Sequence, residues 1–185
     1  IWSSLVGSEM CIRDSNNTAV GAHALGSNTT GTQNVAVGGV TLSANSTGSY
    51  NTGVGYEVLA SHTASYNTAF GYHALYQNTT GDRNTAVGES ALQSNTTGQF
   101  NVAIGSRAVI SGTGSNNVII GKSAAEDGSF TGNNTVAIGY YAGAESQGAN
   151  SIAIGQASGR IVQQGSAVAL GNISGYSTPL SYTHL

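Results

Sequence analysis

The chain has 185 residues, of which only 7% are charged, and its formal net charge at pH 7 is −3. This near-neutral, slightly acidic balance argues against nucleic acid as a partner, because a phosphate backbone is recognised by clustered lysines and arginines. The sequence contains no run of about 20 apolar residues, so it predicts no membrane span. The chain contains 27 glycines and many Ser, Thr and Asn residues. This composition is typical either of a chain built from short repeats or of a disordered chain.

The two ends of the chain differ from the rest. Residues 9–13 (EMCIR) can be back-translated as GAG ATG TGT ATA AGA, and the reverse complement of that DNA encodes residues 181–185 (SYTHL). This resembles the translation of an inverted adapter sequence from a sequencing library. We therefore expect residues 1–15 and 177–185 to be non-native segments, and residues 16–176 to form the repeat domain. Without Glu9, Arg13 and Asp14 the formal charge changes from −3 to about −2, and Cys11 carries no redox argument.

A short apolar tripeptide closed by glycine occurs ten times, at intervals of 16 to 18 residues. A fixed short period indicates one small unit stacked on itself, whose neighbours cover its apolar face. A disordered chain would not need the same apolar tripeptide at regular intervals, so the pattern favours a folded repeat. We call the closing residues the anchor glycines: Gly21, Gly38, Gly55, Gly71, Gly88, Gly105, Gly121, Gly139, Gly155 and Gly171.

The residues three and one before each anchor are almost all β-branched or aliphatic, and those between them are mostly alanine. Because side chains alternate across a strand, the first two columns share one face and the small column lies on the other. We expect the branched face to be the core, with one stacked column formed by the residues directly before the anchors: Val20, Val37, Val54, Phe70, Val87, Ile104, Ile120, Ile138, Ile154 and Leu170.

After each of the first six anchors, a second apolar pair such as Ala24-Leu25 or Ala74-Leu75 follows, and most of these rungs then carry a turn such as Asn28–Gly31. Asn and Gly tolerate the left-handed backbone that tight turns need. The unit therefore predicts strand, turn, short strand and turn, with no helix. The expected fold is all-β, a parallel β-solenoid of about ten rungs of 16–18 residues.

Candidate chemistry is sparse. His23 and His73 share a column with Glu57, but they do not form a closed ligand set for a metal. Glu57 and Asp82 are the nearest pair of carboxylates by rung for a glycosidase, and His62 has no partner that the sequence can place. We expect no enzymatic activity, no metal and no cofactor.

Four tyrosines directly or nearly follow an anchor: Tyr56, Tyr72, Tyr140 and Tyr141. Exposed rings on stacked rungs are suited to a strip that binds a glycan or another surface. The alternative is that the rings pack from rung to rung and hold the solenoid together.

The small column suggests self-association. Solvent exposure would favour larger polar residues, so a column made almost entirely of alanine and glycine indicates close approach of another backbone. We expect a trimer interface, although burial inside a narrow monomeric roll is the alternative. The residues of this expected interface are Ala19, Ala36, Ala69, Ala86, Ala103, Ala137, Ala153 and Ala169.

The segments 134–139 (NTVAIG) and 150–155 (NSIAIG), and more weakly 166–171 (SAVALG), resemble the head repeats of YadA-like trimeric autotransporter adhesins. The resemblance implies a left-handed β-roll, a homotrimer, and a bacterial cell-surface module that binds a host-surface, matrix or glycan receptor. The repeats also resemble phage tail-fibre segments, which would place the chain in a virion tail.

An ice-binding solenoid is a further alternative. Thr18, Thr52, Thr68 and Thr85 fall in one column, and flat threonine ladders order water. Valines interrupt that column, which we expect to face the core.

Overall fold

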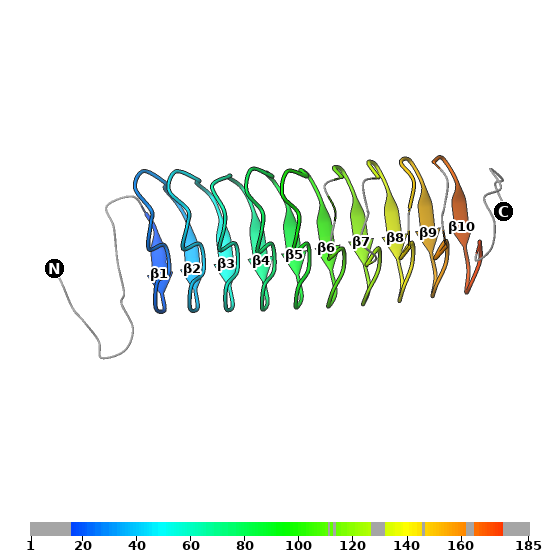
Figure 1. The fold of residues 1–185 in the computed structure, drawn as a ribbon, viewed down its shortest axis with the longest axis horizontal. Coiled ribbons are helices and arrows are strands. Elements are labelled where there is room, and N and C mark those ends of the chain that lie inside the picture. Colours follow the sequence, from blue (N-terminus) through cyan, green and yellow to red (C-terminus); the bar gives the residue numbers. More distant parts are fainter. Residues whose placement is uncertain are drawn as a thin grey trace.

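The computed structural model describes residues 16–110, 112, 114–126, 132–145, 147–161 and 165–175. The expected non-native segments 1–15 and 177–185 lie outside these residues. The described chain is an all-β parallel β-solenoid without a helix, as predicted, and its strands stack in chain order along one axis (Figure 1). The ten strands are β1 (Thr18–Val20), β2 (Val35–Val37), β3 (Thr52–Val54), β4 (Thr68–Phe70), β5 (Thr85–Val87), β6 (Val102–Ile104), β7 (Val118–Ile120), β8 (Val136–Ile138), β9 (Ile152–Ile154) and β10 (Val168–Leu170).

Each strand pairs in parallel with the next, and equivalent repeat positions face one another, as in Ala19↔Ala36 and Ala86↔Ala103. The anchor glycines end the strands in a backbone conformation that L side chains rarely adopt, with φ of 123° at Gly71. A Cβ atom on Gly71 would also lie 2.6 Å from the carbonyl oxygen of Gly88 in the next rung. The glycine at this position therefore permits both the turn and the close stacking of rungs.

The core lies on the side of the strands that the sequence analysis assigned to an interface. In every strand the middle side chain is buried and the two flanking side chains are partly or largely exposed. The predicted core column is therefore wrong: Val20, Phe70, Val87, Ile104, Ile154 and Leu170 are exposed, and Val37, Val54, Ile120 and Ile138 are only partly covered. The small column is instead buried inside a narrow roll, which was the alternative to the trimer interface.

The bulk of the core comes instead from the residues four after the anchors. Leu42, Leu59 and Leu75 are completely buried. The leucines of this column have φ near +50°, which is costly for a residue with a Cβ, so the second short strand expected at these positions is replaced by a turn segment. Hydrogen bonds between rungs hold this conformation, as in Leu42 N–H to the carbonyl of Val58 at 2.9 Å.

A buried ladder of asparagines lines the same interior. Asn34 donates its backbone N–H to Oδ1 of Asn17 at 2.8 Å, and its side-chain amide donates to the carbonyl of Gly48 at 2.8 Å. This arrangement repeats from rung to rung and satisfies polar groups that water cannot reach. The members of the ladder are Asn17, Asn34, Asn51, Asn67, Asn84, Asn101 and Asn117.

Candidate functional site

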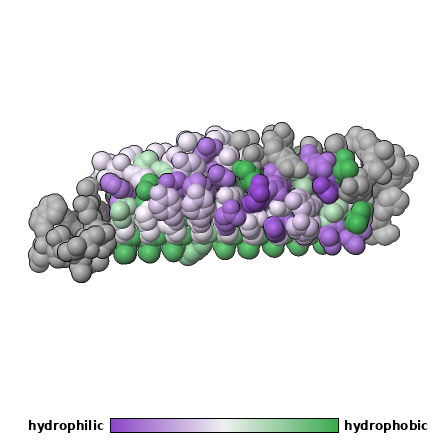
Figure 2. Space-filling model, turned by 60° about the horizontal axis from the view of Figure 1, so that its bottom comes forward, coloured by the Kyte–Doolittle hydropathy of each residue, from purple (hydrophilic) through white to green (hydrophobic). Residues whose placement is uncertain are grey.

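A straight apolar strip runs along the outside of the sheet. It consists of the two outward-facing residues of each strand, three and one before the anchor, and none of them is buried. Val20 is 42% exposed at one end, Ile104 is 40% exposed in the middle and Leu170 is 47% exposed at the other end. Figure 2 shows a continuous hydrophobic row along one edge of the molecule. We call the outward residues of β1 to β10 the apolar strip.

The strip contains no charged residue and only four polar ones, Thr18, Thr52, Thr68 and Thr85. Its ten rungs, about 4.8 Å apart, extend over roughly 43 Å. Continuous exposed apolar surface of this kind marks interaction sites in soluble proteins. The sequence pattern predicts both columns on one face, but that face is the outside of the solenoid and not the expected core.

The alanine column, which we expected on the surface as a trimer interface, is instead buried within its own chain. The side chains of this column point into the solenoid of their own chain, where they pack against the opposite wall of the rung. The residues concerned are Ala19, Ala36, Ala69, Ala86, Ala103, Ala137, Ala153 and Ala169, each at most 6% exposed.

The four tyrosines of the expected binding strip form two separate pairs. The rings of Tyr56 and Tyr72 are stacked with centroids 6.1 Å apart, and Tyr140 meets Tyr141 edge to face at 4.4 Å. Tyr72 also stacks on His73 with centroids 3.8 Å apart. This is rung-to-rung and neighbour packing, the alternative considered for these rings.

Glu57 and His73 meet across adjacent rungs, with 2.7 Å between Oε2 and Nε2. The Glu57 carboxylate raises the pKa of Tyr56 through a hydrogen bond from the phenol. Asp82 is engaged elsewhere, since its Oδ1 accepts the backbone N–H of Ser65 at 2.8 Å. In the described part of the chain, no three His, Cys, Asp or Glu side chains are grouped so that they could hold a metal ion.

A second row of side chains, five before the anchors, was not identified from the sequence. Tyr50 and Tyr66 are stacked with centroids 4.8 Å apart and an angle of 3° between their planes. The Arg83 Cζ atom lies 5.0 Å from the Tyr66 ring centroid and 5.4 Å from that of Phe100. We call Tyr50, Tyr66, Arg83 and Phe100 the aromatic ladder. The signal that could have revealed it is their common position in four consecutive repeats.

His62 lies inside the solenoid and is fully buried. Its Nδ1 atom is 3.0 Å from Nδ2 of Asn78, and its Nε2 atom is 3.2 Å from Oδ1 of Asn51. Burial lowers the pKa of His62 to about 4, although the nearby carbonyl of Asn78 acts in the opposite direction. A neutral, enclosed imidazole of this kind supports packing rather than surface chemistry.

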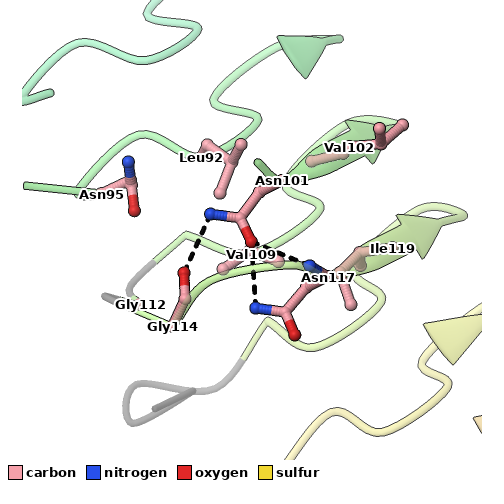
Figure 3. Close-up of a pocket in the computed structure, with 10 residues that line it drawn as sticks. Leu92, Asn95, Asn101, Val102, Val109, Gly112, Gly114, Asn117 and Ile119 are labelled. Atoms are coloured by element: carbon pink, nitrogen blue, oxygen red, sulfur yellow. Dashed lines mark hydrogen bonds between the residues drawn. The ribbon is translucent and has the colours of Figure 1, made fainter. Parts of the chain in front are cut away.

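A small cavity of about 10 Å³ lies beside β6 and β7 (Figure 3). Leu92, Val109 and Ile119 line it together with Asn101. The Asn101 amide donates to the carbonyl of Gly114 at 2.9 Å, and Asn101 Oδ1 accepts hydrogen bonds from the backbone N–H and from the side-chain amide of Asn117. A space of this size corresponds to about one water molecule, so it cannot hold a substrate.

Comparisons with protein-family models, with curated protein sequences and with solved structures found no match. Over the residues that the structure describes, no helix is long and apolar enough to cross a membrane. The β-solenoid architecture is consistent with structural and adhesive repeat modules, and its surface carries the apolar strip and the aromatic ladder.

Proposed function

We propose that the chain is a non-enzymatic adhesion and structural module, a stretch of a homotrimeric β-roll from a bacterial surface adhesin. The observation that carries this proposal is the apolar strip. Its occupant is a second and third copy of the same chain, packed strip to strip around a common axis.

Two features of the strip favour a copy of the chain as its occupant. The strip is straight and has the period of the rungs, so another solenoid of this sequence matches it at every step. It is also free of charge, so identical strips approach without repulsion. Burying the strip would stabilise each chain, because apolar area removed from water contributes about 25 cal/mol per Å².

The location follows from the same proposal. The resemblance of residues 134–139 and 150–155 to adhesin head repeats supports the bacterial cell surface as the place of action. A phage tail-fibre segment in a virion tail is the alternative. The sequence of the gene around the repeats distinguishes the adhesin from the tail fibre. A coiled-coil stalk and a membrane anchor indicate an adhesin, whereas a self-cleaving C-terminal chaperone indicates a tail fibre.

Ice binding is the second candidate function, and one observation favours it. Thr18, Thr52, Thr68 and Thr85 lie on the outward face, not in the core, so the main argument against an ice-binding threonine row does not apply. In this case the strip remains free in solution and orders water.

Analytical ultracentrifugation at micromolar concentration tests the proposal. The unaltered chain is expected to sediment as a trimer, and Ile104→Glu as a monomer with an unchanged circular dichroism spectrum. Thr97→Glu, which adds the same charge at an exposed turn position, serves as the matched control and should remain trimeric. A monomeric unaltered chain would refute self-association, and thermal hysteresis of that monomer would then support the ice-binding alternative.

A further inference from the structure

We propose that the aromatic ladder binds an acidic polysaccharide, with the Arg83 guanidinium as the contact for a carboxylate group of the polymer. This inference rests on the proposed surface-binding role of the chain, but not on its self-association, because all four ladder residues belong to one chain.

Arg83 is a cation that the protein holds in place without neutralising it. Arg107 and Arg160 face the carboxylates of Glu126 and Glu145 at 2.8 and 3.5 Å. Among the described residues no carboxylate pairs with Arg83, and the side chain is exposed. The rings of Tyr66 and Phe100 hold it from both sides instead. A guanidinium held between two rings loses little conformational entropy when it donates two hydrogen bonds to a carboxylate.

The stacking also determines which part of each ring a ligand meets. The faces of Tyr50 and Tyr66 are turned toward each other along the solenoid axis, and Tyr66 and Phe100 direct a face toward Arg83. A ligand therefore approaches the ladder from the side, where it meets ring edges. Ring edges carry partial positive charge, whereas ring faces carry partial negative charge. Edges, phenol hydroxyls and the guanidinium together form a surface that suits anionic oxygens.

The shape of the ladder favours a polymer over a small anion. Four consecutive rungs contribute one side chain each, which gives a row about 14 Å long. Tyr50, Tyr66 and Phe100 are each 49% exposed, so the row is accessible along its whole length. An extended polysaccharide can place one carboxylate on Arg83 and its hydroxyl groups along the neighbouring phenols.

Isothermal titration calorimetry on the full chain, at low ionic strength, tests the inference with three probes. Hyaluronan supplies carboxylates, heparin supplies sulfates as well, and dextran supplies neither. We expect hyaluronan to bind and dextran not to bind. Arg83→Gln should weaken hyaluronan binding by at least about tenfold, since a charge-assisted hydrogen bond pair is lost. Added salt should weaken binding of the unaltered chain.

Lys122→Gln is the matched control, because it also removes one exposed positive charge but lies outside the ladder. It should leave hyaluronan binding within about twofold of the original, as expected for a distant screened charge. Equal loss in both variants, binding of dextran, binding of heparin without hyaluronan, or no binding at all would each overturn the inference. Light scattering on the same samples reports self-association separately, so failure of the trimer and failure of the ladder are distinguishable.

Discussion

A Cβ atom on Gly53 would lie 2.7 Å from Cγ2 of Thr41, closer than two non-bonded carbon atoms pack in proteins. Gly53 occupies the inward position of β3, where nearly all other strands have alanine. The wall opposite is larger here than in most rungs, because Thr41 and Val58 stand where Ala74 and Ala91 stand further along. The two walls of the solenoid therefore share a fixed volume, and one wall becomes smaller where the other becomes larger.

Gly53→Ala is expected to destabilise the chain by about 1–3 kcal/mol, the usual cost of overpacking a core. The change should cost much less in a Thr41→Ser background, because serine lacks the Cγ2 methyl group but keeps the hydroxyl that donates to the carbonyl of Gly55 at 2.8 Å. Urea unfolding of the single and double variants measures the coupling. Additive effects of the two changes would contradict the shared-volume argument.

Leu75→Ala should destabilise by about 2–5 kcal/mol, because Leu75 is completely buried in the core column. Val87→Ala on the apolar strip should cost less than half as much in dilute solution, where strips are not paired, since Val87 is 36% exposed. Denaturant titration at the lowest workable concentration makes the comparison. A larger loss for Val87→Ala would restore the core assignment made from the sequence.

The period of the sequence predicts the fold and the register, because one stacking step brings equivalent residues together, as in Thr18↔Val35. It does not predict which face is inside, since alternation shows only that Thr18 and Val20 share a face. In this structure each three-residue strand directs two side chains outward and one inward, and the face that carries the β-branched residues is the exposed one. The inverse sizes of Gly53 and Val58 are the sequence signal that places the small column inside.

Val109→Leu is expected to stabilise the chain by about 0.5–2 kcal/mol. Val109 interrupts the leucine column after Leu92 and lines the cavity of about 10 Å³. It also has φ of 53°, a conformation in which a β-branched side chain is strained. Leucine should both fill the cavity and relieve the backbone strain. The melting temperature in a thermal unfolding experiment reports the combined gain in stability.

Val40→Leu separates these two effects, because Val40 has φ of 59° but does not line the cavity. We expect a smaller gain from it than from Val109→Leu. Equal gains would mean that relief of strain accounts for the whole effect, and a loss at position 109 would mean that the cavity cannot accept another methylene group.

The buried imidazole of His62 is expected to make the folded chain sensitive to acid. With a pKa of about 4 in the folded chain against 6.5 for the ordinary group, the imidazole binds its proton less readily when folded. Between these values the unfolded chain binds more protons, so the free energy of unfolding is highest above pH 6.5 and falls as the pH drops toward 4. The loss from this group by pH 4.5 is about 2–3 kcal/mol. The Asp82 carboxylate slightly favours the protonated form and so limits the loss.

His62→Asn provides the control, because asparagine stands at the equivalent turn position in Asn45 and Asn78. Oδ1 of Asn45 has no hydrogen-bond partner among the described residues, and an asparagine amide at position 62 can supply one. Urea unfolding at pH 7 and pH 4.5 should show a stability difference for the unaltered chain that shrinks by about 2–3 kcal/mol in the variant. Independently of the variant, the imidazole proton resonances of His62 should titrate near pH 4 by NMR. Titration near pH 6.5, or the same acid sensitivity without the histidine, would show that the buried imidazole is not the group that responds to acid.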